Sequence, residues 1–248
     1  MRRFDGKRAL VTGAASGIGR ATVVRLVSEG AAVLAVDRDT EGLHKTMAAA
    51  EGLAGHAVPH TADVTDEVSV EGAVGAAVST FGGLDVLVNV AGIHRATPIE
   101  DLTVDDLHAL FSVNLVGTAL FCRAAVPHLG EGGAVVNVAS AAAIQGNPYM
   151  SAYSASKGAV LSFSRSLAAE LVGRGIRVVP VCPGEVATPL TAGGAVPEHV
   201  DRSYFGRIRS LLGAATPEQI AGVLAFAASE DGGYVTGTEL TVDGGSRT

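Results

Sequence analysis

Short apolar runs alternate along the chain with longer segments of helical periodicity. Seven runs rich in valine, alanine and leucine are short enough to be strands. Between them, apolar residues recur at the three- and four-residue spacing of one helix face. The pattern predicts strands at 8–12, 32–36, 56–60, 85–89, 134–138, 176–181 and 239–242, and helices at 17–29, 40–50, 66–80, 107–129, 151–172 and 217–229.

Most of these strands are almost continuously apolar, which is typical of parallel strands covered on both faces. Helical crossovers between the strands predict an α/β fold: a Rossmann-type, doubly wound parallel seven-stranded sheet with helices on both faces. We expect a single domain over 1–248. The segment at 190–212 fits no crossover, contains Tyr204 and Phe205, and is predicted to form a flap over the substrate.

Composition and charge narrow the class of protein. Of 248 residues, 32 are glycine, 48% are hydrophobic and 17% are charged, which excludes a disordered chain. A net charge of −7 argues against nucleic acid or an anionic membrane as a partner, and no apolar run approaches the ~18 residues of a membrane span. Cys122 and Cys182 lack the spacing of metal ligands or of a disulfide framework. We therefore expect a cytoplasmic enzyme without a metal site.

A glycine-rich turn follows the first predicted strand. Gly13, Ser16, Gly17, Ile18 and Gly19 form a GxxxGxG pattern where the next helix begins. Glycines at such a turn let a pyrophosphate approach the backbone at the positive end of the helix. Because the spacing differs from GxGxxG, the alternative is a turn that only packs the helix on the strand.

An acid closes the second predicted strand. Asp37 lies 24 positions after Gly13, where a carboxylate suits the 2′-hydroxyl of a bound ribose and repels a 2′-phosphate. This position favours NAD(H) over NADP(H). Arg38 follows directly; an arginine can pair with a 2′-phosphate, but beside Asp37 we interpret it as stacking on adenine or as solvated.

Tyr153 and Lys157 are four residues apart in a predicted helix, so their side chains share one face. The alternative is an ordinary surface pair. Ser140 strengthens the catalytic interpretation because it directly follows the fifth predicted strand, 13 residues before Tyr153.

Several further motifs complete a pattern that resembles the short-chain dehydrogenase/reductases, in the branch whose chains have about this length. The resemblance covers essentially the whole chain. It rests on TGxxxGIG at 12–19, Asp63-Val64, Asn89-Val90-Ala91-Gly92, Asn114, Ser140, Tyr153 with Lys157, Pro183-Gly184 leading to Thr188, and VDGG at 242–245.

The resemblance implies a catalytic tetrad of Asn114, Ser140, Tyr153 and Lys157. Tyr153 would exchange a proton with the substrate oxygen, and Ser140 would orient that oxygen. Lys157 would hold the nicotinamide ribose and lower the Tyr153 pKa, since an ammonium about 4 Å away supplies about the 4 kcal/mol needed. Asn114 would fix a water of a proton relay.

The resemblance also implies a cofactor site and an assembly. Asp63 would contact adenine and Thr188 the carboxamide, whereas Asn89 is expected to brace the sheet rather than touch substrate. A homotetramer with helices 107–129 and 151–172 and the C-terminal segment at its interfaces is implied as well. The predicted cofactor-binding set is Gly13, Ser16, Gly17, Ile18, Gly19, Asp37, Arg38, Asp63, Val64, Asn89, Ala91, Gly92, Tyr153, Lys157, Pro183, Gly184, Val186 and Thr188.

The substrate end is less defined by the sequence. Val90 stands where the family often has a second asparagine, and Glu185 is either a solvated loop charge or a contact to a polar substrate group. His94 is a further candidate for the pocket. We expect the pocket to involve the flap and Ala141, Gln145, Asn147, Tyr149, Glu185 and His94.

These observations predict an NAD(H)-dependent oxidoreductase that interconverts a secondary alcohol and a ketone, with Tyr153 as general acid/base. One alternative is an NADPH-dependent 3-oxoacyl-carrier-protein reductase, against which Asp37 and the uncharged Ser16 argue. The other is a catalytically silent NAD-binding regulator, against which the complete tetrad argues.

Overall fold

Seven parallel strands form one sheet in the order β3-β2-β1-β4-β5-β6-β7. The computed structural model describes residues 2–192 and 200–248. The chain runs outward from β1 to β3 and then returns to β4 on the other side of β1, so a crevice opens at the carboxyl ends of β1 and β4. The strands are β1 Arg8–Thr12, β2 Ala32–Asp37, β3 His56–Thr61, β4 Leu84–Asn89, β5 Leu129–Val138, β6 Arg177–Pro183 and β7 Leu240–Val242.

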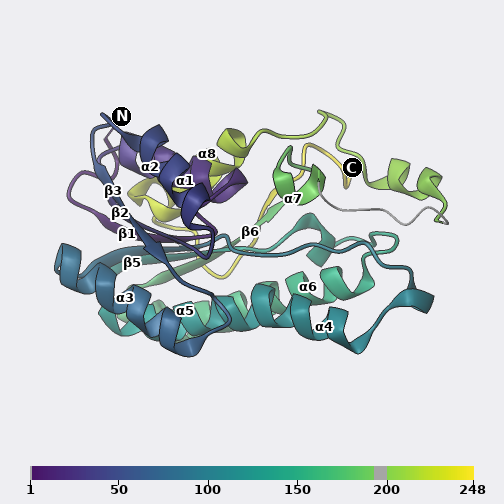
Figure 1. Cartoon of the computed structure of the whole chain (residues 1–248), viewed down its shortest axis with the longest axis horizontal. Helices are drawn as coiled ribbons and strands as arrows, with labels where there is room; N and C mark the ends of the chain where they lie inside the picture. The colour runs from purple at the N-terminus through teal and green to yellow at the C-terminus, as the bar shows by residue number, and fades with distance from the viewer. Residues whose placement is uncertain (1, 193–199) are drawn as a thin grey trace.

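Helices cover both faces of this sheet (Figure 1). On one face, α1 (Gly17–Ser28) contacts both α2 (Thr40–Ala50) and α8 (Pro217–Ala228). The other face is covered by α3 Glu67–Phe81, α4 Val104–Phe111, α5 Gly117–Ala125 and α6 Ser151–Leu171. A short helix, α7 (Pro189–Ala192), follows β6.

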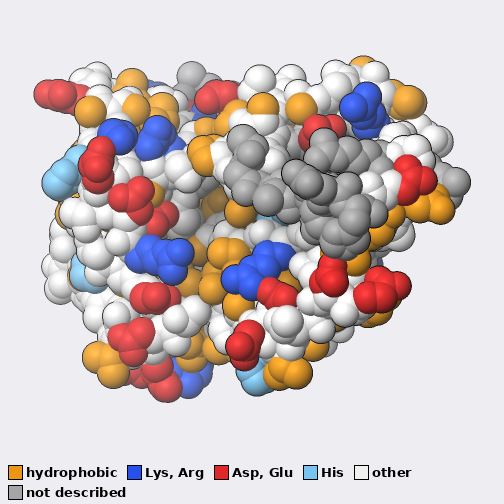
Figure 2. Space-filling view, turned by 45° about the vertical axis from the view of Figure 1, so that its right-hand side comes forward, with side chains coloured by type: hydrophobic (Ala, Val, Ile, Leu, Met, Phe, Trp, Pro, Cys, Tyr) orange, Lys and Arg blue, Asp and Glu red, His pale blue; other side chains and the backbone are white. Residues whose placement is uncertain are grey.

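Successive strand residues point to opposite faces and therefore enter different cores. In β1, Val11 packs in the same core as Leu26 of α1 and Ile220 of α8. Leu10 packs instead in the core that contains Phe121 of α5. Both faces of the central strands are buried, which explains their continuous apolar runs. On the surface, acidic and basic side chains are interspersed over the face shown in Figure 2.

The predicted fold class is confirmed, but the predicted helix 107–129 is not a regular α-helix throughout. It begins earlier, as α4, passes through a π segment, η2 (Ser112–Val116), continues as α5 and ends in the 3₁₀ turn Val126–His128. β5 then begins at Leu129, five residues earlier than predicted. The pairing of β5 with β4 shifts register between Leu84 and Val86, and Gly132 takes a φ of 80° in the extra length.

The composite helix Val104–His128 is long and apolar enough to cross a membrane by length and composition, with a mean hydropathy of 1.6 over its most apolar 18 residues. A core helix of a soluble protein passes the same test, and charged or polar residues such as Asp106, Asn114 and Arg123 interrupt this segment, so the expectation that no apolar run approaches spanning length is not contradicted. Within the fold, α4 packs against α6, and α5 packs against α3 and β4.

Part of the predicted flap, 193–199, lies outside the described residues. After it, Arg202–Ile208 form a 3₁₀ segment, η6. The ring centroids of Tyr204 and Phe205 lie 6.3 and 5.7 Å from that of Tyr149. This part of the flap therefore packs against the loop that precedes α6.

Candidate functional site

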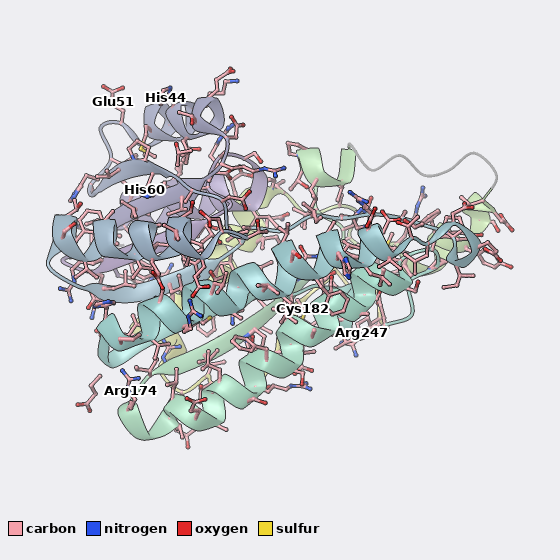
Figure 3. The ribbon with its side chains drawn as sticks, turned by 60° about the horizontal axis from the view of Figure 1, so that its bottom comes forward. His44, Glu51, His60, Arg174, Cys182 and Arg247 are labelled. Carbon is pink, nitrogen blue, oxygen red and sulfur yellow. The ribbon has the colours of Figure 1, made fainter. Side chains whose placement is uncertain are left out.

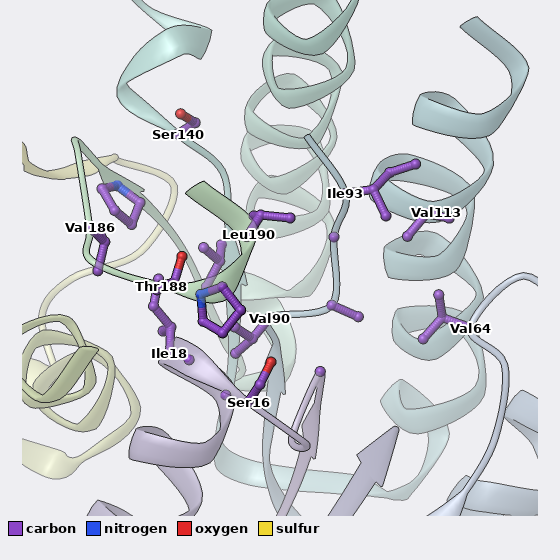
Figure 4. Close-up of a pocket in the computed structure, with 18 of the residues that line it drawn as sticks. Ser16, Ile18, Val64, Val90, Ile93, Val113, Ser140, Val186, Thr188 and Leu190 are labelled. Atoms are coloured by element: carbon purple, nitrogen blue, oxygen red, sulfur yellow. The ribbon is translucent and has the colours of Figure 1, made fainter. Parts of the chain in front are cut away.

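A cavity of about 470 Å³ lies where the carboxyl ends of the central strands meet. In Figure 4, Ser16 and Ser140 lie at opposite ends of the view, and Ile93, Val113 and Val64 lie across from Thr188. Most predicted site residues line this one cavity: Gly13, Ser16, Gly17, Ile18, Gly19, Asp37, Arg38, Asp63, Val64, Ala91, Gly92, Ser140, Tyr153, Lys157, Pro183, Gly184, Val186 and Thr188. Asn89 and Asn114 lie outside its wall.

The turn between β1 and α1 brings backbone close to backbone. Gly13 has a φ of 68°, and a Cβ there would lie 2.7 Å from the backbone nitrogen of Ala91. A Cβ on Gly19 would lie 1.9 Å from the carbonyl oxygen of Gly13. The first turn of α1 therefore opens directly on the cavity, where its N–H groups suit a pyrophosphate. The glycine-rich turn fits a dinucleotide.

Asp37 is fixed at the cavity wall by backbone hydrogen bonds. Its carboxylate oxygens accept from the N–H groups of Ala15 and Asp39, each at 3.0 Å. A carboxylate has about four lone-pair positions, so Asp37 retains the capacity to accept a ribose hydroxyl. Arg38 is exposed and lines the same wall.

Asp63 and Val64 follow β3 and line the same cavity. Asp63 Oδ1 accepts from the backbone N–H and the hydroxyl of Thr65 at 2.8 and 2.7 Å. These two bonds hold the pKa of Asp63 below its ordinary value. Val64 packs closely on Gly117, because a Cβ added at position 117 would lie 2.8 Å from Cγ2 of Val64.

The two asparagines of the prediction act behind the cavity. Asn89 is 3% exposed and donates to Oδ1 of Asn137 on β5 at 2.9 Å, which braces the sheet. Asn114 lies in the π segment; its Oδ1 accepts from Ile93 N–H at 2.8 Å, and its Nδ2 donates to Ser156 Oγ at 2.9 Å. Asn114 thus ties the loop after β4 to α6.

Ser140 and Tyr153 define the catalytic end of the cavity. Ser140 follows β5 and its hydroxyl accepts from Ala142 N–H at 3.1 Å. Tyr153, on α6, is 9% exposed, and burial raises its pKa while a hydrogen bond with Ser140 partly opposes that effect. The expected lowering of the Tyr153 pKa by Lys157 is therefore not found, because burial outweighs the hydrogen bond with Ser140.

Lys157 lies one turn further along α6 and is 4% exposed. Its Nζ donates to the Val138 carbonyl at 2.8 Å, and burial lowers its pKa to about 8. Gly92 leaves the space beside it open. A Cβ at position 92 would lie 3.3 Å from Lys157 Nζ and 3.1 Å from Asn114 Oδ1.

Of the residues expected to line the substrate pocket, Leu190 and Thr191 at the start of the flap lie on the wall of this cavity, whereas the other named candidates do not: Ala141, Gln145, Asn147, Tyr149, Glu185 and His94. Glu185 is exposed, as its solvated alternative predicts. His94 instead packs edge-on against the Tyr153 ring, with centroids 4.7 Å apart. Tyr149 has a φ of 61°, the one positive φ of a non-glycine residue in the described ranges.

Sequence reasoning missed most of the apolar wall. Val90, Ile93, Val113 and Val138 all line the cavity. The available signal was position, since each lies within two residues of a predicted site residue. In residues 2–192 and 200–248, no group of three histidine, cysteine or acidic side chains is placed to hold a metal ion.

A dinucleotide turn that shares one cavity with a buried tyrosine–lysine pair defines a nicotinamide-dependent oxidoreductase. Residues 13–247 match the family described as enoyl-(acyl carrier protein) reductase, and the chain belongs to the short-chain dehydrogenase/reductases. It is 40% identical over 245 residues to the 3-oxoacyl-[acyl-carrier-protein] reductase of Thermotoga maritima, covering 98% of each chain. It is also 39% identical over 252 residues to the D-threitol dehydrogenase of Mycolicibacterium smegmatis, covering 98% of this chain and 94% of that protein.

Solved structures agree with this assignment. A short chain dehydrogenase from Burkholderia cenocepacia in complex with NADP has a TM-score of 0.90 and 38% identity, covering 99% of this chain and 100% of that chain. One from Mycobacterium paratuberculosis bound to NAD has a TM-score of 0.91 and 31% identity, covering 98% of each. The protein is an oxidoreductase that interconverts alcohols and ketones with a nicotinamide cofactor.

Proposed function

We propose that the protein uses NAD(H) to interconvert a small secondary alcohol and its ketone, with Tyr153 as general acid and base. One observation carries this proposal. Tyr153 and Lys157, one turn apart on α6, line the same cavity as the glycine-rich turn. A proton donor and a hydride carrier must reach the same carbonyl group, and one shared cavity permits that.

The chain offers contacts along the whole length of the cofactor, whose nicotinamide supplies or accepts the hydride. Gly13 and Gly17 would accommodate the pyrophosphate, Asp37 the ribose of the adenosine half and Asp63 the adenine. Thr188, near Gly17, would contact the carboxamide. Lys157 would hold the nicotinamide ribose from its place beside the Val138 carbonyl.

Tyr153 would donate its proton to the ketone oxygen and take it back in the oxidation. Ser140, hydrogen-bonded with Tyr153, would orient that oxygen. A general acid–base works best when its pKa lies near the working pH, so positive charge near Tyr153 must offset its burial. Asn114 would hold the relay water beside Lys157 while it fixes Ile93.

Asp37 supports NAD(H) over NADP(H). Both of its oxygens are anchored by backbone N–H groups, so the carboxylate cannot turn away from a 2′-phosphate without losing those bonds. The similarity to the Thermotoga maritima enzyme makes an NADPH-dependent 3-oxoacyl-carrier-protein reductase the second candidate. A silent NAD-binding regulator is disfavoured because Ser140, Tyr153 and Lys157 meet in one cavity.

We also propose a cytoplasmic homotetramer with contacts through α5, α6 and the C-terminal segment. Light scattering on the purified protein would test the assembly.

For the activity, ketones and alcohols should be screened with NADH/NAD and NADPH/NADP. We expect kcat/KM at least about tenfold higher with NAD(H). A higher value with NADPH on 3-oxoacyl thioesters would favour the second candidate, and binding of NAD without turnover would favour a regulator.

A further inference from the structure

Ala14 and Ala15 stand between the glycines of the turn after β1, and both are buried. The N–H of Ala14 donates to the Val36 carbonyl at 3.1 Å, and the N–H of Ala15 donates to Oδ2 of Asp37 at 3.0 Å. Both N–H groups are therefore used on β2. Their two carbonyl groups, which are buried as well, need donors from elsewhere.

Two side chains that do not line the cavity satisfy these carbonyl groups. Thr46 of α2 is fully buried and donates its hydroxyl to the Ala14 carbonyl at 2.7 Å. Arg20 of α1 donates through its guanidinium to the Ala15 carbonyl. The same guanidinium donates to Oγ1 of Thr46 at 3.1 Å. Arg20 and Thr46 thus form a hydrogen-bonded pair behind the turn, which we call the carbonyl clamp.

The helix that carries Thr46 is seated directly on the turn. A Cβ added at Gly42 would lie 2.6 Å from Cβ of Ala15 and 2.9 Å from its carbonyl oxygen. Gly42 is about one helical turn before Thr46, so this close approach brings the threonine hydroxyl within reach of Ala14. The other side of α2 is exposed to solvent at His44 (Figure 3). One face of α2, at Gly42 and Thr46, therefore makes the contact with the turn.

The carbonyl clamp also determines where the N–H groups of the turn point. In a trans peptide the C=O group and the following N–H group point in opposite directions. Holding the Ala14 carbonyl therefore aims the Ala15 N–H at Asp37. Holding the Ala15 carbonyl directs the Ser16 N–H away from Arg20. Ser16 lines the cavity and is the N-cap of α1, where the first N–H groups have no partner within the helix and suit a phosphate.

We propose that Arg20 and Thr46 are positioning residues for the cofactor, which set the affinity for its adenosine diphosphate half without touching it. Thr46 acts through the peptide between Ala14 and Ala15 on Asp37, and so on the ribose. Arg20 acts through the next peptide on the N–H group that faces the pyrophosphate. The inference rests on the proposed function, because that function assigns the turn to a dinucleotide. It goes beyond that function by naming two residues that lie behind the turn.

Equilibrium binding of ADP-ribose tests the clamp without turnover, because this probe carries the adenosine and both phosphates but no nicotinamide. Thr46→Val keeps the shape of the side chain and removes the hydroxyl. The Kd for ADP-ribose, measured by isothermal titration calorimetry, should rise at least about threefold because a buried carbonyl loses its partner. Thr46→Ser retains the hydroxyl and should bind like the wild type. An unchanged Kd in Thr46→Val would overturn the proposal.

Thr22→Val is the matched control for this substitution. Thr22 is as buried as Thr46, and its hydroxyl donates to the Ile18 carbonyl at 2.7 Å. That carbonyl keeps the N–H of residue 22 as its ordinary helical partner, so the Kd for ADP-ribose should stay unchanged. If Thr46 served stability alone, Thr46→Val would lower the unfolding free energy in urea and leave the Kd unchanged. An equal rise of the Kd in both variants would also overturn the proposal.

Arg20→Met tests the other half of the clamp. The substitution removes the donor to the Ala15 carbonyl, so the Kd for ADP-ribose should again rise at least about threefold. Arg25→Met is the control on the same helix, because the guanidinium of Arg25 pairs with Glu29. The double variant of Arg20 and Thr46 should weaken binding by less than the product of the single effects, since the two side chains are bonded to each other. Wild-type binding by Arg20→Met would remove Arg20 from the proposal.

The clamp and the proposed reaction can fail separately. If ADP-ribose binds the wild type and binds both clamp variants more weakly, but no alcohol or ketone is turned over, the clamp stands and the proposed reaction fails. If ketones are reduced with NADH but the clamp variants bind NADH and ADP-ribose like the wild type, the clamp fails and the reaction stands. At saturating NADH, the KM for the ketone should change less than about twofold in the variants, because the clamp acts on the other half of the cofactor.

Discussion

Nζ of Lys157 donates a 2.8 Å hydrogen bond to the carbonyl oxygen of Val138, the last residue of β5. The bond fixes a cation of α6 against the end of the strand that leads to Ser140. The sheet, and not only the helix, therefore determines where this charge lies in the cavity.

Replacing Lys157 by methionine should change the pH dependence of stability. Burial lowers the Lys157 pKa from 10.5 to about 8, so above pH 8 the unfolded chain binds more protons than the folded one. Stability then rises with pH until both states are deprotonated. The unfolding free energy of the wild type relative to Lys157→Met should rise by about 3 kcal/mol between about pH 7 and pH 11, measured by urea denaturation. A constant difference over this range would contradict the prediction.

Tyr153→Phe should abolish most turnover without abolishing cofactor binding. Removal of the hydroxyl removes the proton donor, which is worth about 10²–10⁴-fold in kcat. The Kd for NADH, measured by fluorescence titration, should change less than about threefold. The matched control is Tyr234→Phe, because Tyr234 is fully exposed and does not line the cavity. Substantial activity in Tyr153→Phe would refute the assigned role.

Asp37→Ser should relax the cofactor preference. The substitution removes the charge that repels a 2′-phosphate, so the ratio of kcat/KM for NADPH to that for NADH should rise at least about tenfold, equivalent to about 1.4 kcal/mol. Asp105→Ser, at an exposed position of α4, should leave the ratio unchanged. If Asp37→Ser leaves it unchanged as well, the carboxylate does not determine the preference.

Gly19→Ala should damage the dinucleotide turn. A Cβ at this position would lie 1.9 Å from the Gly13 carbonyl oxygen, so the turn must move. We expect a loss of about 1–3 kcal/mol in unfolding free energy and an NADH Kd at least about tenfold weaker.

The control for that substitution is Gly72→Ala in α3, where nothing lies within 4 Å of the added Cβ. This change should stabilise the protein by about 0.5–1 kcal/mol, because alanine favours a helix interior over glycine. Equal effects of the two substitutions in denaturant titrations would show that close packing at Gly19 is unimportant.

The sequence predicted those features that depend on local pattern. The strands end where Asp37 and Asn89 were expected, and the spacing of Tyr153 and Lys157 placed both on one wall. Contacts between distant loops were not predictable in this way. The His94–Tyr153 contact joins residues 59 positions apart, and the raised pKa of Tyr153 depends on the burial that the whole fold imposes.

The contacts of Asn114 depend on the π segment at Ser112–Val116, and a regular α-helix from α4 to α5 would not keep them. Asn114 reaches Ile93 and Ser156 from this wider turn, and Thr118 donates to the Asn114 carbonyl at 2.8 Å. Deleting one residue there would restore ordinary helical winding but rotate Asn114 by about 100° relative to the helix beyond it. We therefore expect insertions and deletions to be accepted more readily in surface loops than within this helix, whose π segment sets the rotation between α4 and α5.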